Sequence, residues 1–330
     1  MISIFKEVLN ISLYVSILIL IVIVLKEKFL SKYTSTFNYI LCIGISLRCI
    51  FIRKIIIPMP EFLKSISYIE NSSSIGTIVE PNNNIDYLKI ICCIWIIGAI
   101  LTAMYYTCYH FKLYINLNNL KKEITDNSIY NLLEKHKKDL NIKRNIKVYK
   151  LDGIYSPMIV GFIKSEIIIP NRDYTYNDLN YVFRHELIHY KRKDNILKLI
   201  LTVATIIHWF NPIIHLFKKY YNDQCELSCD ELVTKKFTLN EIKEYSLLLL
   251  DTMKYKNKLN SSMFVSYLNL NKSNIIKSRI DQILSNKKRK NGKIAAIVLV
   301  VAIMASIVSF RQVVYRIHPS FNSEINTLNL

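Results

Sequence analysis

The sequence predicts an α+β domain with a small sheet, attached to a membrane region of four transmembrane helices. Four long apolar runs lie near the two ends of the 330-residue chain. Between them, helical patterns outnumber short β-rich runs. The mean hydropathy is +0.21, a positive value that indicates a chain partly placed in lipid. These observations predict one unit in the membrane and one in water.

The apolar runs predict membrane spans because a helix needs roughly 20 residues to cross a bilayer. Lys26, Lys28 and Lys32 follow the first run without a small-residue cleavage site. We therefore interpret that run as a retained anchor and not as a signal peptide. The predicted spans are Val8–Leu25, Phe37–Ile57, Leu88–Tyr109 and the slightly shorter Ile294–Phe310.

Basic residues predict the orientation, because loops rich in lysine and arginine stay on the cytoplasmic side. Residues 111–292 carry 32 Lys and Arg against 18 Asp and Glu, so we expect a cytoplasmic domain there. Residues 1–110 would hold three spans, 293–312 the fourth span, and 313–330 a short extracellular tail. This orientation and attraction to anionic lipid explain most of the net charge of +19. Because no nucleic-acid-binding motif appears, we expect no direct binding of nucleic acid.

The predicted strands come first in the cytoplasmic segment. Residues 111–140 are expected to form a helical arm that leaves the third span. "NIKVYKLD" (Asn145–Asp152) alternates like a strand. Ser156–Pro170 contain two short β-rich runs, "SPMIVGF" and "SEIIIP", joined near Gly161. The strands therefore cluster just ahead of a series of helices.

Five helices are expected after the strands. We expect Asn177 to cap the helix through "DLNYVFRHELIHYKRK", and Asp194 to cap the next one, "ILKLILTVATIIHWF". Asn211 and Pro212 would end that second helix. A helix from Ile213 through "CELSCDELV" follows. Two amphipathic helices, "TLNEIKEYSLLLLDTMKYK" and "SNIIKSRIDQILSN", then lead to the last span.

The apolar run Ile196–Phe217 predicts a hairpin. Polar residues such as Lys198 and His208 interrupt it, and two full crossings would need more residues. A membrane-associated hairpin near 195–217, in the cytoplasmic leaflet or the domain core, would bring the next helix back to the preceding one.

The sequence "HELIH" contains the residues of a candidate metal site. His185 and His189 lie four residues apart, so a helix places both imidazoles on one face. This H-E-x-x-H pattern is typical of zinc peptidases, in which two imidazoles and a third protein ligand leave one position open to water. Zinc lowers the pKa of that water to about 7, and Glu186 would act as general base and acid. The alternative is a solvated helix that contains the motif by chance.

A third ligand is expected from "DQCELSCDELV". Glu226 and Asp230 also lie four residues apart on one predicted helix. Glu226 would complete the ligand set, and Asp230 would accept the free N–H of a ligating histidine. The alternative is a pair of ordinary surface acids near Lys235 and Lys236. Because one helix would supply both roles, we favour a Zn²⁺ site.

Several stretches together resemble the BlaR/MecR-type membrane metallopeptidases, family fifty-six of that class. They are "HELIHYKRKD", "HWFNPIIHLF" and "CELSCDE", with "SPMIVGFIKSEIIIP" ahead of them. The likeness covers about Met1 to Phe310. It implies a gluzincin-like zinc metallopeptidase domain on the cytoplasmic side, tied to four spans. It also implies His185, His189 and Glu226 as ligands, Glu186 as the catalytic residue and Asp230 behind the ligands.

One departure from that family concerns the stimulus. Well-known members carry an extracellular penicillin-binding sensor domain after the last span. Only about twenty residues follow Phe310, too few for a folded domain. We therefore expect no sensing of β-lactams by that route, and the stimulus stays open.

The resemblance implies an integral-membrane endopeptidase that cleaves a protein on the cytoplasmic side. The implied substrate is a transcriptional repressor, such as a winged-helix repressor, in an envelope-signal or antibiotic response. Besides the lipid bilayer, the partners we consider are a second copy in a homodimer and the chain itself, by self-cleavage near Asn286–Lys293. The alternatives are a membrane quality-control or prenyl-protein-type zinc protease, and a catalytically silent sensor or scaffold.

The β-rich run before the metal helix also predicts a substrate site. Gluzincins usually align substrate as an added strand at a sheet edge, and Pro157 suits an edge. The predicted substrate-edge strand is Ser156, Pro157, Met158, Ile159, Val160 and Gly161. The oxyanion could be stabilised by Tyr174, Tyr176 or Tyr181.

Other reactive side chains have simpler interpretations. For His208 and His215 we favour buried or interfacial positions over metal binding. Cys225 and Cys229 flank the proposed ligand, but small buried thiols are the usual case. All seven cysteines are expected to be reduced.

Overall fold

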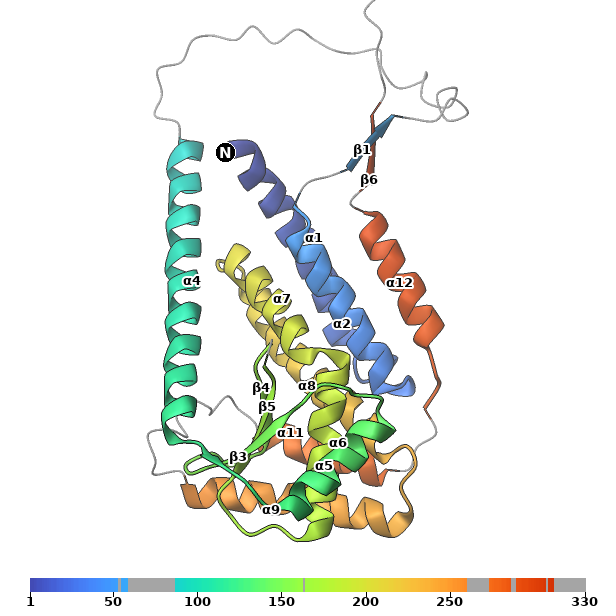
Figure 1. The fold of residues 1–330 in the computed structure, drawn as a ribbon. Helices are drawn as coiled ribbons and strands as arrows, with labels where there is room; N and C mark the ends of the chain where they lie inside the picture. Colours follow the sequence, from blue (N-terminus) through green and yellow to red (C-terminus); the bar gives the residue numbers. More distant parts are fainter. Residues whose placement is uncertain are drawn as a thin grey trace, which may run out of the picture.

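The structure is a computed structural model that describes residues 1–52, 55–58, 87–162, 164–259, 273–285, 289–306 and 308–311. Figure 1 shows helices in the upper part of the molecule and a small sheet with further helices in the lower part. The helices are α1 (Ile2–Leu25), α2 (Ser35–Ile50), α4 (Tyr87–Leu120), α5 (Asn127–Asp139), α6 (Tyr176–Arg192), α7 (Asp194–Ile207), α8 (Pro212–Thr234), α9 (Leu239–Leu259), α11 (Ser273–Leu284) and α12 (Lys293–Ala305). The strands are β1 (Ile55–Pro58), β2 (Lys122–Glu123), β3 (Lys147–Leu151), β4 (Met158–Val160), β5 (Glu166–Pro170) and β6 (Val308–Arg311).

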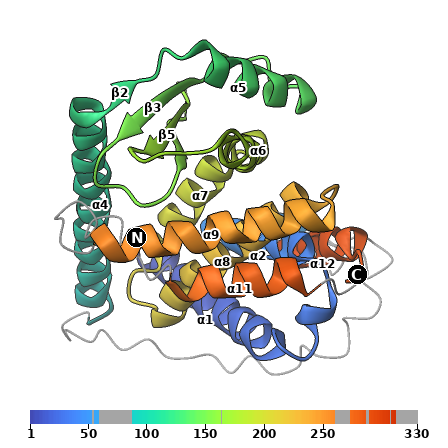
Figure 2. The same cartoon turned by 90° about the horizontal axis from the view of Figure 1, so that it is seen from below.

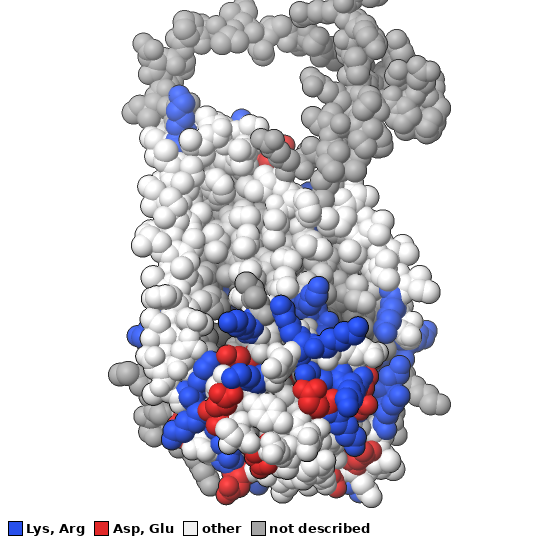
Figure 3. Space-filling model, viewed as in Figure 1, with Lys and Arg blue, Asp and Glu red and all other residues white. Residues whose placement is uncertain are grey.

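Two of the described helices, α1 and α4, are long and apolar enough to cross a membrane. Full spans were expected over Phe37–Ile57 and Ile294–Phe310. The structure has shorter apolar helices there, α2 and α12. The chain beyond each helix is extended, because Ile55–Pro58 and Val308–Arg311 pair as parallel strands. Consecutive isoleucines favour such an extended backbone. Figure 3 shows few charged side chains over the upper part of the face it draws, and many over the lower part.

A hairpin of α7 and α8 packs against α1, α2 and α4. The indole N–H groups of Trp95 and Trp209 donate hydrogen bonds across the α4–hairpin contact, to the carbonyls of Ile207 and Trp95, at 3.0 and 3.1 Å. Asn211, at the hairpin tip, donates to the hydroxyl of Ser16 at 2.7 Å. The tip is therefore fastened to two of the helices that surround it.

The helix boundaries at the hairpin differ from those expected. Helix α7 ends at Ile207 and not at Asn211, which instead caps α8 by accepting a hydrogen bond from the backbone N–H of Ile213. Pro212 then occupies the first turn of α8, where the missing N–H costs nothing. The N-cap of α7 is Lys193, in a left-handed conformation, and not Asp194. The carboxylate of Asp194 has other partners, described below.

The lower part contains a four-stranded sheet in the order β2-β3-β5-β4. Strands β3 and β5 are parallel, whereas β4 runs antiparallel to β5 and lies at an edge of the sheet. Gly161 ends β4 with a φ of 90°, and an added Cβ there would lie 2.1 Å from the carbonyl oxygen of Lys164. The turn between β4 and β5 therefore needs glycine.

The arm expected over residues 111–140 is not one helix. Helix α4 ends at Leu120, and β2 separates it from α5, whose N-cap Asp126 accepts a hydrogen bond from the backbone N–H of Ser128. Such a cap favours a new helix start.

Helix α6 lies beside the sheet and packs against α5, α8 and α9 (Figure 2). Its buried face contains Val182, Phe183 and Leu187. It is capped by Thr175 and not by Asn177, because Thr175 and Asp178 form a reciprocal capping box. The core thus holds α6 between the sheet and the returning helix α8.

Two predictions concern residues outside this description. The predicted tail 313–330 lies outside the described residues, as do three residues of the predicted self-cleavage segment, 286–288.

Candidate metal centre

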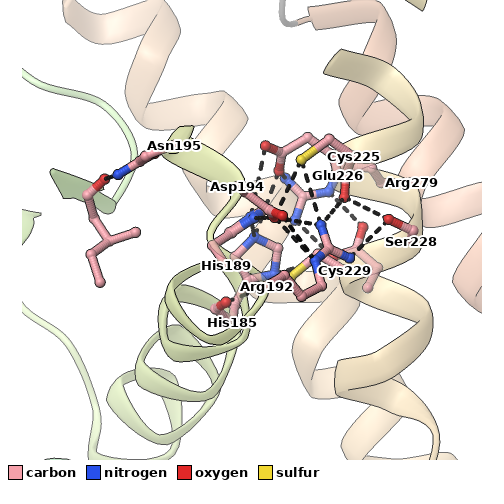
Figure 4. Close-up of polar contacts among 12 residues, drawn as sticks. His185, His189, Arg192, Asp194, Asn195, Cys225, Glu226, Ser228, Cys229 and Arg279 are labelled. Carbon is pink, nitrogen blue, oxygen red and sulfur yellow. Dashed lines mark hydrogen bonds and ion pairs between the residues drawn. The ribbon is translucent and has the colours of Figure 1, made fainter. Parts of the chain in front are cut away.

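The two histidines of α6 share one face of the helix and are buried. Their Nε2 atoms lie 3.0 Å apart. Helix α8 brings Glu226 to the same point (Figure 4). Its carboxylate oxygens lie 3.6 Å from Nε2 of His185 and 3.8 Å from Nε2 of His189. The structure therefore brings together the three side chains that the sequence predicts as ligands.

These separations fit a zinc ion. Tetrahedral zinc with bonds of about 2.0–2.2 Å keeps its ligand atoms about 3.3–3.6 Å apart. Of the observed spacings, 3.6 Å lies at the upper limit of that range, and 3.0 and 3.8 Å lie within about 0.3 Å of its limits. Two imidazoles and one carboxylate are also a ligand set that catalytic zinc uses with water at the fourth position.

Cys229 is a competing ligand. Its Sγ and one nitrogen from each histidine lie within 4.8 Å of one another. However, the thiol contacts the backbone carbonyl of His185 at 3.5 Å, and Cys229 does not line the adjacent cleft, whereas Glu226 does. We therefore favour Glu226, because a catalytic ion must be open to the cleft.

Each histidine is held through its Nδ1 atom. Nδ1 of His189 donates to Oδ2 of Asp194 at 2.6 Å. Nδ1 of His185 lies 2.9 Å from the hydroxyl of Tyr245, which donates to Asp230 at 2.7 Å. Asp230 itself lies 3.4 Å from that Nδ1, so Tyr245 shares the position predicted for Asp230 alone. Both Nε2 atoms remain free to accept a metal.

Arg279, on α11, fixes the acidic side of the centre. Its guanidinium donates two hydrogen bonds to Asp230, at 2.7 and 2.8 Å, and lies 3.3 Å from Glu226. Burial alone would raise the pKa of Asp230, but Arg279 and His185 outweigh it and lower the pKa to about 2. Burial also acts to raise the pKa of Glu226, yet His185, His189 and Arg279 hold it well below the usual value. Both carboxylates are therefore charged at neutral pH.

Asp194 holds His189 in the way that Asp230 and Tyr245 hold His185. Besides His189, its carboxylate accepts hydrogen bonds from Arg192 and from the hydroxyl of Tyr39. Burial acts to raise the pKa of Asp194, but His189 and Arg192 lower it below the usual value. An anionic Asp194 keeps the proton of His189 on Nδ1.

A cleft of about 150 Å³ opens beside the three ligands. Glu186 lines it, as do Lys198 from α7 and Tyr155 ahead of β4. The edge-strand residues that line it are Ser156, Pro157, Met158 and Ile159. The structure thus places part of the predicted substrate strand next to the histidines.

Other predicted candidates lie outside this cleft. Tyr181 donates to Glu244 at 2.9 Å, Tyr174 packs against Arg172, and Tyr176 is exposed. The tyrosines in the cleft are instead Tyr155 and Tyr245.

The two remaining histidines contact backbone carbonyls. His208 is buried with its Nε2 atom 3.0 Å from the carbonyl of Cys49. Nε2 of His215 lies 3.2 Å from the carbonyl of Trp209. Neither residue lines the cleft.

Comparison with known proteins gives evidence on the family of the chain that is independent of the geometry. The model of the family described as BlaR1 peptidase M56 matches residues 6–283. The chain is 28% identical over 226 residues to the methicillin resistance mecR1 protein of Staphylococcus aureus, over 66% of this chain and 37% of that protein. It is 27% identical over 213 residues to the regulatory protein BlaR1 of Staphylococcus aureus, over 62% and 35% of the two chains. For the regulatory protein BlaR1 of Bacillus licheniformis the identity is 26% over 180 residues, and the shares are 52% and 29%. The chain spans 29–37% of the length of these curated relatives.

Proposed function

The chain belongs to the BlaR1 peptidase M56 family, and from this premise we propose that it is a membrane-bound zinc endopeptidase that cleaves a protein on the cytoplasmic side. One observation carries the proposal. His185 and His189 of α6 and Glu226 of α8 converge at spacings that fit zinc, inside a cleft bordered by an edge strand. A helix that contained the motif by chance would not require this convergence.

The proposed chemistry is hydrolysis of a peptide bond. Zinc held by the three ligands would supply a Lewis acid and a bound water with a pKa of about 7. Glu186, which lines the same cleft, would take a proton from the attacking water and return it to the leaving nitrogen. Asp194 and Asp230, behind the histidines, would keep the ligand tautomers fixed.

We propose that substrate binds as an extra strand along β4. The β5 strand pairs with one side of β4, and the other side is an edge. Asn195 donates a hydrogen bond to the carbonyl of Ile159 at 3.1 Å (Figure 4). The N–H and C=O of a strand residue point the same way, so Ile159 faces the edge away from β5. Its N–H could then pair with a substrate carbonyl.

Lys198 of α7 could assist catalysis. It lines the cleft, and no hydrogen bond or ion pair of its ammonium occurs among the described residues. Burial acts to lower the pKa of Lys198, but nearby Cys225, Glu226, Asp194 and Glu186 outweigh it and raise the pKa. A charged ammonium at this position would stabilise negative charge that develops on a substrate carbonyl.

The orientation and substrate are further parts of the proposal. The basic balance of residues 111–292 supports a cytoplasmic catalytic domain. The relatives named as regulatory and methicillin resistance proteins support a regulatory substrate. We propose a transcriptional repressor, such as a winged-helix repressor, as that substrate.

The decisive experiment compares cells that express the wild type and the Glu186→Gln variant. Mass spectrometry of all cellular proteins should find a cleaved repressor only with the wild type, while both purified proteins retain one zinc per chain. Cleavage of many unrelated misfolded membrane proteins would instead support a quality-control protease. An unchanged set of cleaved proteins, together with intact signalling by the variant, would indicate a catalytically silent sensor.

A further inference from the structure

A tyrosine from membrane-region helix α2 contacts the candidate metal centre. Tyr39 is 4% exposed, and its hydroxyl donates to Oδ1 of Asp194 at 2.8 Å. The guanidinium of Arg192 lies over its ring, 4.6 Å from the centroid. Tyr39 is 155 residues away in sequence from Asp194, so only the fold brings the two together.

The carboxylate of Asp194 connects Tyr39 to the proposed ligand His189. Oδ1 of Asp194 accepts from Tyr39, and Oδ2 accepts from Nδ1 of His189 at 2.6 Å. Arg192 also donates to both oxygens, at 3.2 and 3.1 Å. Asp194 is 1% exposed, so water cannot readily replace a lost donor. A rotation of this carboxylate would turn the imidazole of His189.

The start of α2 also contacts the two helices that carry Glu226 and Arg279. The backbone N–H and hydroxyl of Thr36 donate to one oxygen of Glu231 on α8, at 2.9 and 3.0 Å. Ser35 donates to Gln282 on α11 at 2.8 Å. Helices α8 and α11 carry Glu226 and Arg279, respectively. A shift of α2 would therefore change both sides of the ligand set.

We propose that Tyr39 is a positioning residue for His189 that acts through Asp194, and that α2 is thereby the membrane-region helix that sets the geometry of the metal centre. This inference rests on the proposed zinc site. It assigns to α2 the route by which a structural change in the membrane region reaches the catalytic residues.

The test measures zinc affinity of the full-length chain in detergent or nanodiscs, by competition with a chromophoric chelator. Loss of a partner behind a ligating histidine typically weakens metal binding 10- to 100-fold. Tyr39 is one contact further away, so Tyr39→Phe should weaken zinc binding about 3- to 10-fold. The matched control is Tyr220→Phe, because Tyr220 is also buried and its hydroxyl has no hydrogen-bond partner among the described residues. That variant should bind zinc like the wild type.

A double-mutant cycle separates positioning from general destabilisation. If Tyr39 acts through Asp194, Tyr39→Phe should have no further effect on zinc affinity in an Asp194→Asn background. Equal affinities of Tyr39→Phe and Tyr220→Phe, or additive losses in the cycle, would overturn the inference and leave the proposed function intact. Failure of the wild type to bind zinc would instead reject the proposed function and, with it, this inference.

Discussion

Nδ1 of His189 lies 2.6 Å from Oδ2 of Asp194, so a carboxylate from the first turn of α7 fixes a ring that belongs to α6. The left-handed Lys193 makes this possible, because it turns the chain sharply between the two helices. The same turn explains why Asp194 does not cap its own helix.

Replacement of Asp194 by asparagine should weaken zinc binding about 10- to 100-fold. An amide can no longer hold the proton of His189 on Nδ1 with a full negative charge. Chelator competition on the purified variant measures the change. Asp173→Asn is the control, because Asp173 is exposed. Wild-type affinity in Asp194→Asn would contradict the proposed role.

Replacement of Glu186 by glutamine should lower kcat for peptide cleavage about 10²- to 10⁴-fold, the range expected for loss of a general base. Zinc content should remain at one ion per chain, because Glu186 is not among the three proposed ligands. His185→Ala provides the contrast and should lose both zinc and activity. Loss of zinc from the glutamine variant would show that Glu186 binds the metal.

Removal of zinc should destabilise the protein as well as abolish cleavage. An ion that binds only the folded chain adds about 2.7 kcal/mol to the free energy of unfolding at 100 times its Kd. A thermal unfolding series with and without excess zinc should therefore show a higher Tm with the ion. The increment should vanish in His185→Ala, and an increment that persists there would place zinc at another site.

Substrate binding along β4 should depend on every second amide of a peptide substrate. Only alternate N–H groups of an added strand point toward Ile159, and each hydrogen bond contributes about 0.5–1.5 kcal/mol. N-methylation of one such amide should raise KM about 2- to 10-fold. Methylation of the neighbouring amide is the control. Equal effects at all positions would argue against strand addition.

Replacement of Arg279 by methionine should lower the free energy of unfolding at pH 7 by about 3–5 kcal/mol, because it leaves buried charges unpaired. Asp230 has a pKa lowered to about 2 in the folded chain. Its contribution to stability is therefore present above the usual carboxyl pKa and is lost as the pH falls toward 2. The deficit of the variant should accordingly shrink in acid. An equal deficit at pH 7 and pH 2.5 would show that packing, and not charge, is responsible.

The local patterns of the sequence predicted the ligand helix, the returning helix and the strands ahead of them. Two residues four apart, such as His185 and His189, are fixed by helix geometry alone. The partners Tyr39, Tyr245 and Arg279 could not be predicted, because their roles depend on contacts between distant segments. Tyr245 and Arg279 appeared only as members of amphipathic helices.

The hairpin of α7 and α8 begins beside the metal centre at Asp194 and returns to it at Glu226, after its tip has been fastened to α1 through Asn211. His185 and His189 precede Glu226 in the sequence, so a ribosome synthesises the two histidines first. The contact of Asn211 with Ser16 on α1 can therefore form before Glu226 is synthesised. If the site holds zinc as proposed, the complete ligand set forms only once the hairpin has folded, which would make zinc loading a late step of biogenesis.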